Sequence, residues 1–149
     1  MKAVLLLGLC LVFTGVIPEW TTDFSHAKEL AAKESRLILL NFSGSDWCAP
    51  CIRLKKEVFS LAKFNETAEN HLVLVNADFP RSRKNKLDKQ LQLQNEALAE
   101  KYNPQGKFPF TLLLRANGSV IQSWDGFPRG GAESFTNELQ QLCKTNLPE

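Results

Sequence analysis

Continuous apolar stretches alternate along the chain with stretches in which apolar residues recur every three or four positions. The continuous stretches, residues 36–42 and 71–77, have strand length, and they predict strands buried on both faces of a sheet. Helical spacing predicts helices over residues 24–35, from Cys51 to about residue 60 or further, and over residues 90–102. Such an order predicts parallel strands joined by crossover helices.

The C-terminal third predicts a hairpin followed by a helix. Asn117-Gly118 stands between residues 107–115 and residues 119–124, and an Asn-Gly pair between two strand-like stretches favours an antiparallel hairpin. The inward face of the last helix is predicted to consist of Phe135, Leu139, Leu142 and Cys143. The whole order predicts one three-layer α/β/α domain with a central mixed sheet and a C-terminal antiparallel hairpin.

Residues 1–18 have a different character from the rest of the chain. Lys2 is followed by an apolar run, residues 3–13, of the length expected for the central part of a signal peptide. We therefore expect a signal peptide or N-terminal anchor at 1–18, the folded domain at 19–149, and a periplasmic or otherwise exported protein that could be anchored to the membrane. A buried N-terminal strand is the alternative. Cys10 follows Leu9 rather than a small residue, which argues against lipidation.

Composition narrows the classes of function. The 149 residues suffice for one domain with its own core, and a net charge of +2 gives no reason to expect a nucleic-acid partner. Only two of the four cysteines are close in sequence, which excludes a small scaffold held by many disulfides. We expect a monomer without cofactor or bound metal.

The candidate chemistry lies in the stretch Trp47-Cys48-Ala49-Pro50-Cys51, between a predicted strand and a predicted helix. A sulfur at the N-terminus of a helix faces unpaired backbone N–H groups and the positive end of the dipole, which favour the reactive thiolate. A second sulfur, separated from the first cysteine by two residues, can attack a mixed disulfide formed by the first. Pro50 suits a first helical turn, because it needs no hydrogen-bond partner for a backbone N–H.

Two other interpretations of this pair are a static structural disulfide and half of a zinc site. Zinc needs four ligands, and the remaining candidates, His26, His71 and Cys143, are isolated in the sequence. His26 is expected on a solvated helix face and Cys143 in the core. The spacing therefore favours redox chemistry, for which we expect the sulfurs to face solvent.

A second feature is a cationic stretch that contains Arg81, Arg83, Lys84, Lys86 and Lys89. A run of charge is more often a solvated loop than a docking surface for an acidic partner, and the first interpretation is favoured here.

The ordered set of motifs resembles the thioredoxin superfamily over nearly all of residues 20–147. Three separated signatures agree: Trp47–Cys51 after the first long strand, Phe108-Pro109 at the start of the hairpin, and Gly126 after it. The run of residues 41–48 is similar to that of exported bacterial thioredoxin-like proteins near the periplasmic disulfide reductases.

The resemblance implies a role for each matching residue. Cys48 would be the attacking thiolate and Cys51 the resolving thiol, and the two would form a disulfide when oxidised. The substrate surface would consist of Trp47, Pro50, Phe108 and Pro109. The Phe108-Pro109 bond would be cis, and the backbone of Phe108 would pair with the substrate chain.

Two departures from the family pattern concern the site. Family members usually have a buried Asp on the strand that leads to the motif, whereas the matching residue here is Asn41, which cannot act as a general base. The segment of residues 80–95 is longer than in a minimal thioredoxin. It could cap the sheet or select a partner.

The resulting hypothesis is a thiol–disulfide oxidoreductase that acts on protein disulfides or dithiols, in the reducing direction, with a membrane electron donor. The alternative is a thioredoxin-fold binding or assembly module whose cysteines form a static disulfide. Peroxidase activity is a weaker third hypothesis, because the sequence shows no polar peroxide pocket.

Overall fold

Strand β2 (Leu37–Ser43) is buried along its whole length, and its alternate side chains enter two separate cores. Ile38, Leu40 and Phe42 point into one core, and Leu37 and Leu39 point into the other. A strand between two apolar layers needs apolar residues on both faces, which explains the continuous apolar run in the sequence.

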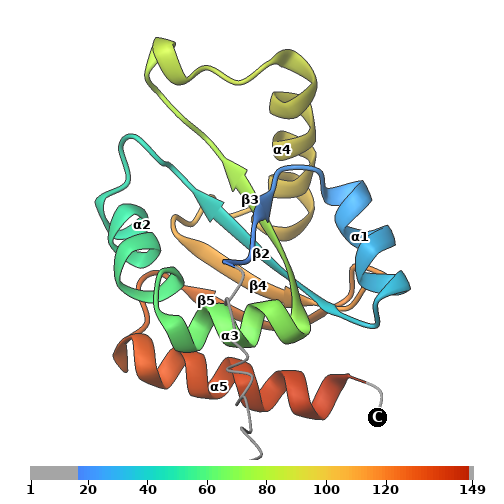
Figure 1. Cartoon of the computed structure of the whole chain (residues 1–149). Helices are drawn as coiled ribbons and strands as arrows, with labels where there is room; N and C mark the ends of the chain where they lie inside the picture. Colours follow the sequence, from blue (N-terminus) through green and yellow to red (C-terminus); the bar gives the residue numbers. More distant parts are fainter. Residues whose placement is uncertain (1–16, 148–149) are drawn as a thin grey trace, which may run out of the picture.

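The computed structural model describes residues 17–147, and Figure 1 shows them as a mixed sheet with helices on both faces. The strand order is β1-β3-β2-β4-β5. Strands β1, β2 and β3 are parallel, β4 is antiparallel to β2, and β5 is antiparallel to β4. The strands other than β2 are β1 (Trp20–Thr21), β3 (Leu72–Asp78), β4 (Phe110–Leu114) and β5 (Val120–Asp125).

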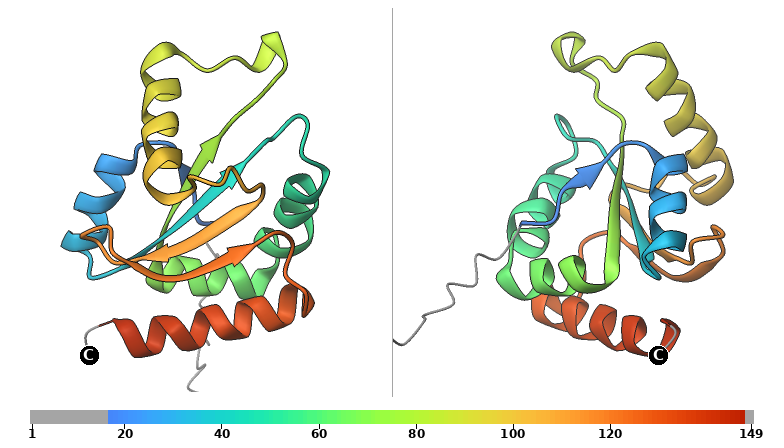
Figure 2. Two further views of the ribbon diagram at one scale, coloured as in Figure 1. Left: turned by 180° about the vertical axis from the view of Figure 1, so that it is seen from behind. Right: turned by 45° about the vertical axis from the view of Figure 1, so that its right-hand side comes forward.

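Helices cover the two faces of the sheet unequally, as Figures 1 and 2 show. Helices α1 and α4 lie on one face, and α2, α3 and α5 lie on the other. Their bounds are α1 (Phe24–Lys33), α2 (Ala49–Leu54), α3 (Ala62–His71), α4 (Lys89–Tyr102) and α5 (Gly131–Asn146), with a π-helical turn (Lys55–Phe59) after α2 and a 3₁₀ turn (Arg83–Asn85) before α4. The predicted three-layer α/β/α fold with a mixed sheet and a C-terminal hairpin is confirmed.

Two elements differ from the sequence-based expectation. Strand β1 is only two residues long and was not expected. Helix α3 was not expected as a separate helix, because only Phe64, Thr67 and Ala68 of it are buried. In α4 the buried inward positions include Asn95, and its amide donates to the backbone oxygen of Asp78 at 3.0 Å. A polar residue in the inward stripe was not predictable from apolar spacing.

The predicted signal peptide or anchor at 1–18 falls mainly on residues 1–16, which lie outside the described residues. Within residues 17–147 no helix combines the length and the apolar character that crossing a membrane requires. The domain limits of 19–149 stay a prediction.

The register of the sheet brings three loops to one edge. Ser43 at the end of β2 lies beside Asp78 at the end of β3, and the Phe79 N–H donates to the Ser43 oxygen at 2.8 Å. Phe42 pairs with Phe110 at the start of the antiparallel strand β4. The segments that follow β2 and β3 and the one that precedes β4 therefore meet where the cysteines lie.

Candidate active site

Cys48 and Cys51 form a disulfide at the N-terminus of α2, with an S–S length of 2.08 Å and a Cα–Cα distance of 5.2 Å. Cys48 is the N-cap residue, and its sulfur accepts a hydrogen bond from the Cys51 N–H at 3.3 Å. Pro50 lies in the first helical turn. After reduction, a sulfur in this place is favoured as a thiolate by the helix N-terminus.

The two cysteines lie just under the molecular surface. Cys48 is 4% exposed and Cys51 is 5% exposed. Both residues are thus more buried than we expected for sulfurs that face solvent. The residues around them are more open, because Ala49, Pro50 and Ile52 are exposed. The surface next to the disulfide is therefore formed mainly by these exposed apolar residues, and each cysteine contributes only a small area to it.

Trp47 is the side chain that joins the three loops at this edge. Its Nε1–H donates to the backbone oxygen of Phe79 at 2.7 Å, and its ring lies edge-on to Phe108 at 5.4 Å between centroids. The indole also packs directly against Gly44, where an added Cβ would lie 2.2 Å from Cε2 of Trp47. The close approach explains why the turn before the cysteines contains glycine.

The Phe108-Pro109 segment belongs to the same edge. The peptide bond between the two residues is cis, Pro109 is buried, and its oxygen accepts from the Gly126 N–H at 2.9 Å. The contact between Phe108 and Trp47 places this segment on the side of the sheet edge that holds Cys48. The structure thus joins Cys48 to Cys51 and places Trp47 against Phe108 at the same edge, with Pro50 and Pro109 next to these residues in the chain. The functional roles assigned to the six residues stay predictions.

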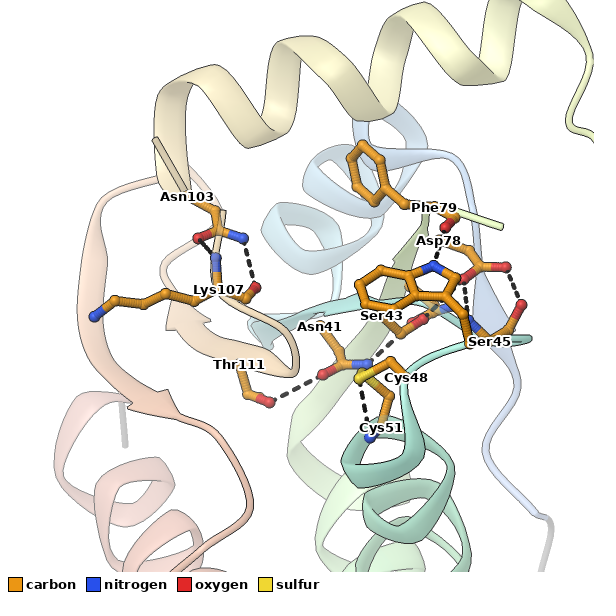
Figure 3. The surroundings of a disulfide bond; sticks show 12 residues. Asn41, Ser43, Ser45, Cys48, Cys51, Asp78, Phe79, Asn103, Lys107 and Thr111 are labelled. Atoms are coloured by element: carbon orange, nitrogen blue, oxygen red, sulfur yellow. Dashed lines mark hydrogen bonds between the residues drawn. A yellow bond between two sulfur atoms is a disulfide. The ribbon is translucent and has the colours of Figure 1, made fainter. Parts of the chain in front are cut away.

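A network of neutral polar groups lies behind the disulfide, as Figure 3 shows. Asn41 is 6% exposed; its amide donates to Oδ1 of Asn76 at 3.1 Å, and its oxygen accepts from Thr111 at 3.0 Å. Ser43 donates to the same oxygen of Asn76 at 3.1 Å and contacts Asp78 Oδ1 at 3.2 Å. The amide–hydroxyl network thus surrounds position 41, where the resemblance to the thioredoxin superfamily would imply a carboxylate.

A pocket of about 310 Å³ borders this network and the resolving cysteine. Its lining includes Cys51, Asn41, Ser43, Asn76 and Lys55. The pocket can admit solvent, since a single water needs far less volume and several polar partners are present.

A comparison with protein families decides the classification of this site. The model of a thioredoxin-like domain family matches residues 24–142, which is most of the chain and includes every strand from β2 to β5. The chain belongs to the thioredoxin-like family. Its chemistry is thiol–disulfide exchange, carried out by a cysteine pair at the N-terminus of a helix.

Relatives and solved structures agree with this thioredoxin-like assignment. The chain is 29% identical over 126 residues to the disulfide bond reductase DsbH of Chlamydia pneumoniae, a match that covers 85% of this chain and 73% of the relative. It is 27% identical to the thioredoxin-related protein DsbJ of Chlamydia pneumoniae, over 83% of this chain and 34% of that longer relative. A solved structure titled DsbH oxidoreductase superposes with a TM-score of 0.79 at 25% identity, and the match covers 95% of both chains.

One structural part of this thioredoxin-like site, the set of hydrogen bonds accepted by Asp46, was not expected from the sequence. Asp46, just before Trp47, accepts hydrogen bonds from the N–H groups of Arg81 and Ser82 at 2.9 Å each and from Asn85 at 3.0 Å. These donors hold the pKa of the Asp46 carboxyl below its usual value, with the Arg81 N–H as the largest cause. A charged residue in a turn gives no sequence signal of such a distant partner.

Cys143 takes no part in the site. It is fully buried in the core formed by the sheet, α3 and α5, and burial raises the pKa of its thiol to about 12. Among residues 17–147, no three His, Cys, Asp or Glu side chains are grouped as a metal site would require.

The contact between Gly44 and Trp47 predicts a strong coupling between these positions. Gly44→Ala should lower the free energy of unfolding by about 1–3 kcal/mol, because the new methyl group overlaps the indole. In a Trp47→Ala background the same change should cost much less. Urea unfolding of the four proteins of this cycle measures the coupling, and equal costs in both backgrounds would contradict the assigned clash.

The burial of Cys143 predicts selective alkylation. In the reduced, folded protein at pH 8, iodoacetamide should modify Cys48 and leave Cys143 unmodified, because the Cys143 thiol stays protonated and covered. Peptide mapping by mass spectrometry locates the label, and the protein in urea serves as the control in which Cys143 reacts. Labelling of Cys143 at the same rate with and without urea would show that its burial is wrong.

Proposed function

We propose that this chain is an exported protein-disulfide reductase in which Cys48 is the attacking thiolate and Cys51 the resolving thiol. The observation that supports the proposal most directly is the position of Cys48 as the N-cap of α2, with its sulfur accepting the Cys51 N–H. The names of the relatives DsbH and DsbJ support the same chemistry, and the name of DsbH supports its direction.

The reaction consists of two exchanges. The Cys48 thiolate attacks one sulfur of a substrate disulfide, so that a Cys48–substrate disulfide forms and the other substrate sulfur leaves as a thiolate that takes a proton. Cys51 then loses its proton and attacks the Cys48 sulfur, which releases the second substrate thiolate and leaves the Cys48–Cys51 disulfide. Two electrons pass from the cysteine pair to the substrate.

The surface around the cysteines suits an extended protein chain. Pro50 and Ile52 are exposed, and Trp47 and Phe108, which contact each other, are half-buried, so exposed apolar area is available near Cys48. Within residues 17–147 no hydrogen bond occupies the backbone N–H or oxygen of Phe108. A substrate strand can pair there, next to Pro109, as the family resemblance implies.

The proton of Cys51 needs an acceptor other than the residue at position 41. Asn41 is an amide, and its oxygen and nitrogen are already engaged by Thr111 and Asn76. The pocket that borders Cys51 gives solvent access to this side of the disulfide. We infer that water in this pocket, or a group of the partner, takes the proton during the second exchange.

The remaining parts of the proposal concern the cellular setting. The apolar segment at the N-terminus supports export to the periplasm or a similar compartment, with or without a membrane anchor. In such a compartment the oxidised pair requires a source of electrons, for which we propose a membrane protein. The catalytic unit is proposed to be a monomer.

One observation favours the alternative of a binding module with a static disulfide. The cysteines are only 4% and 5% exposed, as they would be in a purely structural disulfide. The two functions differ in whether Cys48 forms a covalent bond with a substrate.

Trapping separates these two functions. Cys51→Ser should accumulate mixed disulfides with substrate proteins through Cys48, because the second exchange is blocked. The wild type should accelerate the reduction of insulin by dithiothreitol, and Cys48→Ser should lose that activity by at least about 100-fold, since it lacks the nucleophile. Turbidity measures insulin reduction, and non-reducing gels detect the trapped species. A silent wild type together with an empty Cys51→Ser trap would establish the static disulfide.

The direction of electron flow is testable by the reduction potential of the Cys48–Cys51 couple. We expect a reduction potential close to that of thioredoxin, which is about −270 mV, and far from that of a dedicated oxidant, which is about −120 mV. Equilibration with glutathione buffers at neutral pH, followed by mass spectrometry of the alkylated pair, gives the potential. A value close to that of the oxidant would reverse the proposed direction.

A further inference from the structure

The loop between β3 and α4 is held beside the disulfide by a single carboxylate. Asp46, two residues before Cys48, accepts three hydrogen bonds from residues of this loop. The Phe79 oxygen at the start of the loop also accepts from Trp47. We call residues 81–86 the cationic loop, and these bonds fix its base next to the candidate active site.

The cationic loop presents unpaired positive charge to solvent. Its four cations, Arg81, Arg83, Lys84 and Lys86, are all exposed, and none forms an ion pair with any of residues 17–147. The loop itself contains no acidic residue, and Asp46 beneath it is occupied by the loop's own N–H donors. The local charge is thus positive and available to a partner.

Arg81 is the cation of this loop that stacks on Trp47, the residue before Cys48. Its guanidinium carbon lies 3.7 Å from the centroid of the Trp47 ring, directly above the side chain that precedes Cys48. The guanidinium N–H groups donate to no residue within the described part of the chain. A stacked guanidinium with free donors can bind a carboxylate through two parallel hydrogen bonds.

A pocket of about 300 Å³ adjoins the cationic loop. Arg81, Arg83 and Lys86 contribute to its lining, together with the apolar Phe79 and Leu87. Asp78 and Glu96 also line it, so its electrostatic character is mixed rather than uniformly positive. The pocket can take an apolar side chain of a substrate while the exposed cations contact acidic residues next to it.

We propose that the cationic loop selects substrates in which acidic residues flank the disulfide. This inference rests on the proposed function and adds the chemical class of the substrate. Charge at the rim of an interface acts chiefly on the rate of association and is screened by salt. The effect therefore belongs to the first exchange, in which the Cys48 thiolate meets the substrate disulfide.

The test measures that exchange directly. A full-length Cys10→Ser, Cys51→Ser protein retains Cys48 and the buried Cys143 as its thiols. It is mixed with three short peptides, each with one cysteine as a 2-pyridyl disulfide, flanked by Glu, by Lys or by Ser residues. Cys48 attack forms the protein–peptide disulfide and releases 2-thiopyridone, which absorbance follows. Each rate is divided by the rate of the same peptide with dithiothreitol.

We expect the acidic peptide to react about tenfold faster than the basic peptide at low salt. The ratio should fall to within about twofold in high salt, where the Debye length shrinks to a few ångströms. The triple variant Arg83→Gln, Lys84→Gln, Lys86→Gln should lose most of the preference, and Arg81→Gln alone should reduce it. The matched control is Lys33→Gln, Lys101→Gln, Lys144→Gln, which removes the same charge from exposed positions on other helices and should keep the preference.

The outcomes separate the inference from the function on which it rests. If no peptide reacts, Cys48 is not a nucleophile, and both the proposed function and the proposed substrate selection are overturned. Equal normalised rates for the three peptides would overturn only the substrate selection. Loss of the preference in the control triple variant would also overturn it, by assigning the effect to total charge. Equal peptide rates, with loop-dependent binding to anionic lipid vesicles, would assign the loop to a membrane surface instead.

Discussion

The burial of β2 on both faces constrains the rest of the structure. Each of its seven residues is buried, so a shift by one position would exchange the side chains of the two cores. The fixed register against β3 and β4 places Ser43 beside Asp78, and Phe42 beside Phe110. The position of Cys48 relative to the Phe108-Pro109 segment follows from this pairing.

The chemistry behind the cysteines is neutral in this chain. Asn41, Asn76, Ser43 and Thr111 satisfy one another by hydrogen bonds, and the described residues contain no buried side-chain nitrogen or oxygen without a partner. A buried carboxylate at position 41 would require a charge partner or a raised pKa, whereas an amide needs neither. The amides and hydroxyls of the network pair without any change of protonation, and Asp78 lies beside them at the edge of the sheet, in contact with Ser43 and Ser45.

Much of the fold was predictable because apolar spacing reports burial directly. The strands predicted at 36–42 and 71–77, which the structure has at 37–43 and 72–78, and the buried Cys143 follow from such spacing. The hairpin follows from the Asn117-Gly118 turn between two strand-like stretches. The cysteine motif was predictable because its two sulfurs are close in sequence. The bonds between Asp46 and residues 81–85 were not predictable, because they join segments 35 or more positions apart. Two of the donors are backbone N–H groups, which any residue has, and Asp46 and Asn85 are residue types that suit any solvated loop.

The three hydrogen bonds that Asp46 accepts affect how a partner protein can bind at this edge of the sheet. These bonds join the turn that precedes the cysteines to the cationic loop that follows β3, so the two segments are held in one fixed arrangement. Binding of a partner then costs little backbone entropy, because the cationic loop is ordered before the partner binds. The fixed shape and charge of the cationic loop can therefore discriminate between partners without a rearrangement of the chain.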